Sequence, residues 1–242
     1  MLPVCTAMAF NAISTKLSGK MEKNDWYRKT SWSSEDEKDF FAYLQRARSS
    51  YNKAQYLRIQ AYYLQRECSP PNYQAALALL EHLIAHYPDP NEIGSAYLQK
   101  AKCLEELGQW DEALQVYRQA LAAGKNAQGF FTTDVPTHFA LFVARHGYKT
   151  CYEEALRHIK DAEVVLLLPQ SQWQVLAAMA IMAAGTGRKR KAVELARKAL
   201  AIDIEHERQG DAPEAAIRQR LQQIVRTGTG KWWPFRRLSK GG

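Results

Sequence analysis

Four alanines set the spacing of this chain. Ala76, Ala113, Ala155 and Ala192 are separated by 37, 42 and 37 residues. Each begins a set of apolar or small residues at i, i+4 and i+7, which is the period of one face of an α-helix. A small side chain at such a position lets a neighbouring helix approach closely, because the distance between helix axes depends on the residues at the contact. The spacing therefore predicts a row of similar helical units.

The clearest unit covers residues 95–124, SAYLQKAKCLEELGQWDEALQVYRQALAAG. It predicts two amphipathic helices joined by a tight turn at Gly108, where a left-handed backbone conformation costs glycine little. Both halves show the helical period, and the residues on the two apolar faces are Tyr97, Ala101 and Leu104, then Ala113, Tyr117 and Ala120.

This pattern resembles the tetratricopeptide repeat (TPR), in which aromatic and small residues alternate at set positions of a helical hairpin. The resemblance rests on the six residues above together with Gly108, and the chain departs from the pattern at Lys100 and Lys125. Hairpins of this family have a period of ~34 residues and stack on one another, because one hairpin cannot bury its apolar faces alone. Further copies are therefore expected on both sides.

Three weaker hairpins are predicted over residues 53–88, 137–166 and 173–203. A preceding helix would begin with a capping box of Ser34 and Glu37 and run to about Tyr51. A last helix over residues 214–226 would cap the array with a polar outer face. The predicted fold is all-α, a right-handed α-solenoid of about four TPR-like hairpins with an N-terminal helix and a C-terminal capping helix.

The ends of the chain differ in composition from the predicted repeat domain at residues 34–226. Residues 1–33 are expected to form a flexible segment, with Met21 as an alternative start, although Trp26, Tyr27 and Trp32 favour packing back onto the first helix. Residues 227–242 form a basic aromatic tail. Basic residues 188–191 form a second cluster at a helix start, where the helix dipole disfavours cations.

The sequence offers no catalytic constellation, and the phosphate-loop, dinucleotide-binding, nucleophile-elbow and zinc-protease motifs do not occur. His82 and His86 lie one helical turn apart, but no third ligand is suggested by spacing, so a metal site is not expected. Glu105 and Glu106 are interpreted as solvated charges near a helix end. The four dispersed cysteines favour reduced thiols and a cytoplasmic location. We expect no enzyme activity and no cofactor.

The TPR resemblance implies that a partner binds in a concave groove lined by the first helices of successive hairpins. Within that groove Arg58 and Lys102 would meet a carboxylate, and Tyr62 would supply an aromatic anchor. The Lys/Asn arrangement of chaperone-binding TPR clamps is not reproduced. The groove residues carried over by position are Gln55, Arg58, Tyr62, Gln65, Ser95, Leu98, Gln99 and Lys102.

The predicted function is that of a non-catalytic adaptor for a protein or peptide, with an inhibitor or immunity-type protein as one form of it. The alternative is association with an anionic membrane or with nucleic acid through the tail, because interleaved aromatic and basic residues suit both surfaces. The tail residues concerned are Lys231, Trp232, Trp233, Phe235, Arg236 and Arg237.

Overall fold

The computed structural model describes residues 25–125, 134–162, 168–202 and 212–228, and these residues form helices and no β-strand. Two short 3₁₀ helices, η1 (Asp25–Tyr27) and η2 (Lys149–Cys151), accompany the α-helices. The α-helices are α1 (Ser34–Gln45), α2 (Ser50–Gln65), α3 (Pro70–His86), α4 (Ile93–Glu106), α5 (Trp110–Ala123), α6 (Val135–His146), α7 (Tyr152–Asp161), α8 (Pro169–Gly185), α9 (Lys189–Ala201) and α10 (Ala212–Thr227).

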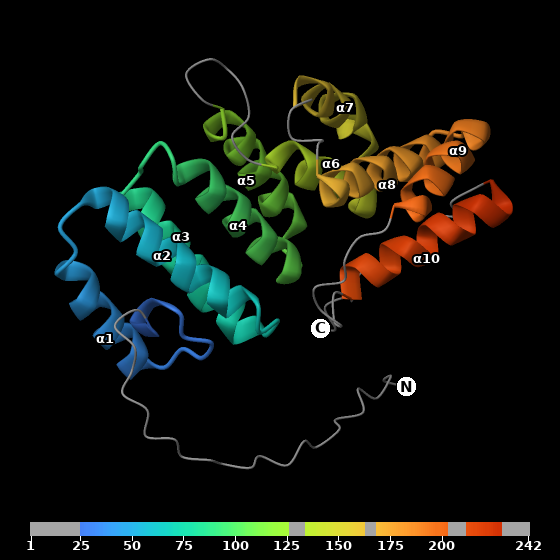
Figure 1. The fold of residues 1–242 in the computed structure, drawn as a ribbon. Helices are drawn as coiled ribbons and strands as arrows, with labels where there is room; N and C mark the ends of the chain where they lie inside the picture. The colour runs from blue at the N-terminus through green and yellow to red at the C-terminus, as the bar shows by residue number, and fades with distance from the viewer. Residues whose placement is uncertain (1–24, 126–133, 163–167, 203–211, 229–242) are drawn as a thin grey trace, which may run out of the picture.

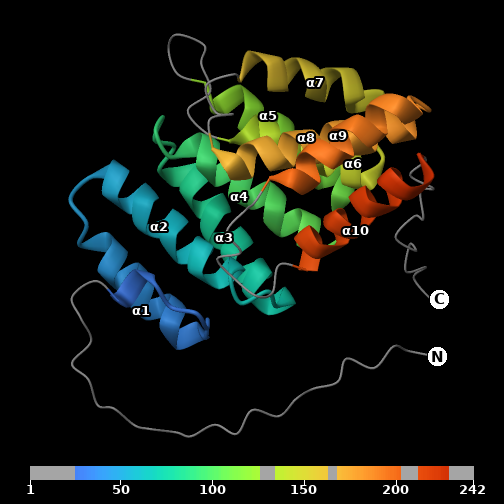
Figure 2. The same cartoon turned by 45° about the vertical axis from the view of Figure 1, so that its right-hand side comes forward.

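Consecutive helices pack as hairpins: α2 with α3, α4 with α5, α6 with α7, and α8 with α9. The helices follow one another in an arc from α1 to α10, and α5 and α7 lie on its outer side (Figure 1). Helix α10 lies along α9 and also contacts α8, which the turned view shows as well (Figure 2). The predicted all-α TPR-like solenoid is confirmed.

The alanines that set the sequence spacing are all fully buried, one on each of α3, α5, α7 and α9. The helix turns use glycine where the backbone requires it, since Gly108 and Gly187 have φ of +76° and +78°. Gly94 serves a different purpose, because a Cβ there would lie 2.8 Å from the Cα of Gly124. The start of α4 and the end of α5 therefore meet backbone to backbone.

The N-terminal helices correct two predictions. The predicted single helix to Tyr51 is wrong: α1 ends at Gln45, and α2 begins at Ser50 with Ser49 as its N-cap. The capping box consists of Ser33 and Asp36, one residue before the predicted pair. Lys29 selects this register, because its Nζ lies 2.6 Å from Asp36 Oδ1. The hydrogen bonds from Lys29 and Ser33 lower the pKa of Asp36 to about 2.

The segment before α1 is part of the folded unit from residue 25 onward. Trp26 packs against the rings of Phe40, Tyr43 and Tyr56, with centroid distances of 4.9–5.4 Å. The Gln60 side chain accepts from the backbone N–H of Lys29 and donates to its carbonyl, at 2.9 and 2.7 Å. The predicted flexible segment therefore extends too far, since aromatic packing fixes residues 25–33. Residues 1–24 and the tail at 229–242 lie outside the described residues.

The hydrophobic interior forms two cores that meet at α4. The N-terminal core contains Phe40 and Leu57 and includes Ala96 and Cys103 of α4. The C-terminal core runs from α4 to α10, with Ala101 and Leu104 of α4 at its near end. Helix α4 therefore buries opposite faces in two different cores, which ties the first hairpin to the rest of the array.

Candidate interaction face

The predicted groove residues lie on α2 and α4, the first helices of two successive hairpins, and we call this surface the first-helix face. Its most exposed member is Tyr62, at 42% of full exposure. Leu98 is 6% exposed and belongs to the C-terminal core, so its predicted role as a groove residue is wrong. Leu98 lies about one helical turn before Ala101, on the side of α4 that contributes to the C-terminal core.

Polar contacts join α2 to α4 in a fixed register. Arg58 forms an ion pair with Glu92, and Glu92 is buried at the N-cap of α4. The side-chain amide of Gln65 donates to the carbonyl of Gln99 at 2.8 Å and contacts the sulfur of Cys103 at 2.8 Å. Arg58–Glu92 and Gln65–Gln99 are both 34 residues apart in sequence. Equivalent turns of the two helices therefore lie opposite each other.

A second polar cluster joins α4 to α6. Lys102 Nζ lies 3.2 Å from His138 Nε2, which lies 2.8 Å from Asp134 Oδ2. Burial and the Lys102 charge lower the pKa of His138. Burial opposes ionisation of Asp134, but the His138 hydrogen bond and the charges of His138 and Lys102 outweigh it, so the pKa of Asp134 lies well below its usual range.

These contacts change what the predicted cations offer to a partner. Arg58 is neutralised by Glu92, and Lys102 lies in one cluster with Asp134. The expectation that both cations meet an incoming carboxylate is therefore not supported by their surroundings. Each pairs within the fold, because neighbouring first helices bring an acidic residue into reach. Sequence reasoning placed the cations but missed Glu92, Asp134 and His138.

Two other groups on the face are not used fully by the fold: a polar atom that lacks a hydrogen-bond donor and an exposed aromatic ring. The Oε1 atom of Gln99 is buried, and no donor in the described part of the chain reaches it. Ser95 lies one turn before Gln99 and is partly exposed. Tyr62 lies one turn before Gln65, the residue that contacts Gln99, and Arg66 lies over the Tyr62 ring at 5.9 Å from the centroid.

The exposed stripe extends along α2 to Tyr51. Tyr51 is 40% exposed, and its hydroxyl accepts from the side-chain amide of Gln55 at 3.2 Å. Tyr51, Gln55, Arg58 and Tyr62 recur at helical spacing along one side of α2. Sequence reasoning missed Tyr51 because it assigned this residue to the end of the preceding helix. Its position one turn before Gln55 is the signal that would have found it.

Glu105 is a further correction, because it is buried at 9% exposure and not solvated. Its carboxylate accepts from His146 at 2.9 Å and from the Tyr117 hydroxyl at 3.2 Å, and it lies 3.1 Å from Arg145 Nη1. Burial alone would raise the pKa of Glu105, but these partners lower it. Glu105 therefore joins α4, α5 and α6 within the fold.

Other candidate chemistry finds little support in the described residues. His82 and His86 stack on each other at 4.2 Å, and burial lowers the pKa of His82. No group of three metal-ligating side chains occurs within residues 25–125, 134–162, 168–202 and 212–228. None of the described helices is long and apolar enough to cross a membrane. The predicted tail residues, Lys231 to Arg237, lie outside the described part.

Comparison with known proteins supports the repeat fold that the structure shows. Residues 72–129 match the family model of the tetratricopeptide repeat. The chain is a TPR-like helical repeat protein. The matched segment covers most of α3 and all of α4 and α5, so it includes the half of the first-helix face that α4 provides. No curated protein and no solved structure matches the chain. TPR repeats generally mediate protein–protein interaction and are generally non-catalytic, which supports an adaptor role for this TPR-like protein.

Proposed function

We propose that this TPR-like protein is a non-catalytic adaptor that binds a peptide or protein segment along the first-helix face. The observation that carries the proposal is the unpaired, buried Oε1 of Gln99, on the same face as the exposed ring of Tyr62. A buried acceptor without a donor costs about 1–3 kcal/mol. A partner N–H group that the Gln99 side chain meets by turning outward would remove that cost, and an exposed aromatic ring on the same face is a frequent binding hot spot.

The charge of the face constrains the partner. Arg58 is paired with Glu92, and Lys102 is clustered with Asp134, so the face carries a balanced set of charges. Selection of a strongly acidic segment would need unpaired cations. We therefore infer that the protein recognises its partner through hydrogen bonds and aromatic packing, and that the partner directs a hydrogen-bond donor at Gln99.

Substitution of Gln99 tests this proposal. Gln99→Met keeps the size and removes the unpaired acceptor, so it should stabilise the free protein by about 1 kcal/mol in urea unfolding. The same change should weaken partner binding at least about tenfold, since a hydrogen bond made only in the complex is lost. Loss of stability together with unchanged binding would contradict the proposal.

A photo-crosslinking residue can identify the partner and the face at once. Placed at Tyr62, it should capture a protein partner in cells. Placed at Tyr43, which has nearly the same exposure but lies on α1, it should not, which makes it a matched control. Equal capture at both positions would move the binding site away from the first-helix face.

Two details of the proposal, the kind of partner and the location in the cell, have tests of their own. An inhibitor or immunity-type role would make the captured partner an enzyme, and an equimolar amount of this protein should then abolish its activity. A cytoplasmic location rests on the dispersed cysteines of the sequence. Cell fractionation of the untagged protein tests it.

A further inference from the structure

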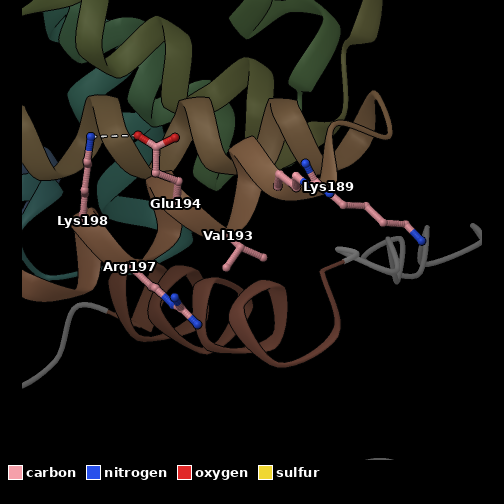
Figure 3. Close-up of a pocket in the computed structure, with 6 residues that line it drawn as sticks. Lys189, Val193, Glu194, Arg197 and Lys198 are labelled. Atoms are coloured by element: carbon pink, nitrogen blue, oxygen red, sulfur yellow. Dashed lines mark hydrogen bonds and ion pairs between the residues drawn. The ribbon is translucent and has the colours of Figure 1, made fainter.

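The second surface of interest lies on α9, away from the first-helix face. An open depression of about 580 Å³ follows this helix and is lined by Lys189, Arg190, Val193, Glu194, Arg197 and Lys198 (Figure 3). Val193 and Arg197 point to one side of α9, whereas Glu194 and Lys198 point to the other (Figure 3). The depression therefore contains two rows of side chains with different charge patterns.

One row is internally neutralised. Glu194 lies between Lys198 and Lys191, with distances of 2.8 and 3.2 Å to their ammonium groups. All three side chains are about half exposed, so these pairs are of the weak surface kind. Glu194 nevertheless places a negative charge in the middle of the depression, which disfavours a continuous polyanion such as a nucleic-acid backbone.

The other row consists of Lys189, Val193 and Arg197 at i, i+4 and i+8. The side chains of Lys189 and Arg197 are exposed, and neither forms an ion pair or a side-chain hydrogen bond with a described residue. Val193 is partly buried and packs on the C-terminal core. The row therefore presents cation, apolar group and cation in that order. Eight residues of helix place the two cations ~12 Å apart along the axis.

The end of α10 lies beside the stem of Lys189, the first cation of this row. A Cβ added at Gly228 would lie 3.7 Å from the Cβ of Lys189, so the stem of Lys189 lies against the C-terminal end of α10. The partial negative charge at that helix end favours a nearby cation and opposes the penalty that Lys189 meets at the start of α9. Its position is thus supported by a second helix.

We propose that the row Lys189–Val193–Arg197 binds an acidic peptide segment in extended conformation, with carboxylates at its first and fifth positions and an apolar side chain at its third. In an extended chain these three side chains lie on one face, and the outer two are ~13 Å apart. That distance matches the separation of the two cations, and the third side chain falls on Val193. The site is separate from the first-helix face and does not depend on its proposed function.

A pair of labelled peptides tests the spacing. GETLTEG places both carboxylates and the leucine on one face, whereas GTELETG has the same composition and charge with the carboxylates only two residues apart. Titration of the full-length protein at low salt, followed by fluorescence anisotropy, should show binding of the first peptide at least about fivefold tighter. Equal affinity for the two peptides would overturn the proposal.

Two charge-reversal variants locate the site. K189E/R197E should weaken binding of GETLTEG about tenfold or more, since both cations of the row change sign. R190E/K191E makes the same change of net charge on the same helix outside the row and should change binding less than about twofold. Equal losses in both variants would show attraction by net charge alone and overturn the proposal.

Controls separate peptide binding from other anionic ligands and from misfolding. A single-stranded oligonucleotide and phosphatidylserine vesicles should compete with GETLTEG only weakly, and stronger binding of either would overturn the proposal. K189Q/R197Q removes the charges without reversal and should give an intermediate loss of binding at unchanged helix content. Full binding by this milder pair would also overturn the proposal.

Discussion

The two hydrophobic cores are neighbours that are built in different ways. The N-terminal core is closed by aromatic rings from outside the repeat pattern, with Trp26 set among Phe40, Tyr43 and Tyr56. The C-terminal core is rich in alanine and contains the buried Glu105 cluster. Both cores contain buried alanines and rings, but the rings that cover the first hairpin come from the segment before it, whereas the rings of the C-terminal core, such as Tyr117 and Phe142, belong to the hairpins themselves.

The largest expected effect tests whether the cores are distinct. Phe40 is 1% exposed, so Phe40→Ala should destabilise the protein by about 3–5 kcal/mol. Hydrogen exchange should increase in α1 to α3 and change little in α8 to α10. Leu221→Ala, in the fully buried face of α10, should show the reverse pattern. If both variants increased hydrogen exchange equally in α1 to α3 and in α8 to α10, the two cores would unfold as one unit.

The charged cluster of the C-terminal core should have the next largest effect. Glu105→Ala leaves Arg145 and His146 partly buried without their acid and should cost about 3 kcal/mol in urea unfolding. Glu81→Ala is the control, because Glu81 pairs with Lys100 while 52% exposed, and it should cost less than about 1 kcal/mol. Similar losses of unfolding free energy in the two variants would show that burial does not make the Glu105 cluster more important for stability than an exposed ion pair.

The same cluster predicts how the stability of the folded protein changes with pH. The pKa of Glu105 is lowered in the folded protein from its ordinary value of 4.5, so its stabilisation is present above pH 4.5. That stabilisation is lost as the pH falls through the folded-state pKa. Glu105→Gln should therefore flatten this part of the acid unfolding curve, and an unchanged curve would contradict the assignment.

The smallest expected effect concerns helix α4, where the cores meet. Gly94→Ala would force a Cβ to 2.8 Å from the backbone of Gly124 and should cost about 2 kcal/mol. Gly185→Ala is the matched control, because its new Cβ meets only the end of the Tyr152 side chain, at 3.1 Å. It should be near neutral, since alanine favours helix over glycine by about 1 kcal/mol. Thermal unfolding of both variants measures the difference.

The repeat pattern was predictable because it is local. Ala113 and Gly108 serve packing and turn geometry within about 30 residues of chain, and the period of the small residues then repeats. The start of α1 was ambiguous, since Ser33 and Ser34 are each followed three residues later by an acid. In the structure Asp36 bonds with both Ser33 and Lys29, and the contact with Lys29 is not visible in the capping pattern itself.

The candidate site was harder to predict because its chemistry depends on residues far apart in sequence. From the sequence, Glu105 is interpreted as a surface charge. The structure shows that Arg145 and His146, which lie 40 and 41 residues later in the chain, pack against it. Arg58 likewise reads as a free cation until Glu92 is positioned by the stacking of α4 on α2. The sequence alone identifies the helical face. It does not show which residues pair with the charged side chains of that face, and therefore does not show whether those charges are neutralised.

Helix α10 contacts mainly α9 and α8 to a lesser extent, as α4 contacts mainly α3 and α2 to a lesser extent. It therefore occupies the place where the first helix of another hairpin would stack. Within the described residues, rings cover the outer side of the first hairpin and α10 covers the last. A further hairpin inserted at either place would have to displace these covers, whereas duplication of an internal hairpin, such as α4 with α5, would leave both in place.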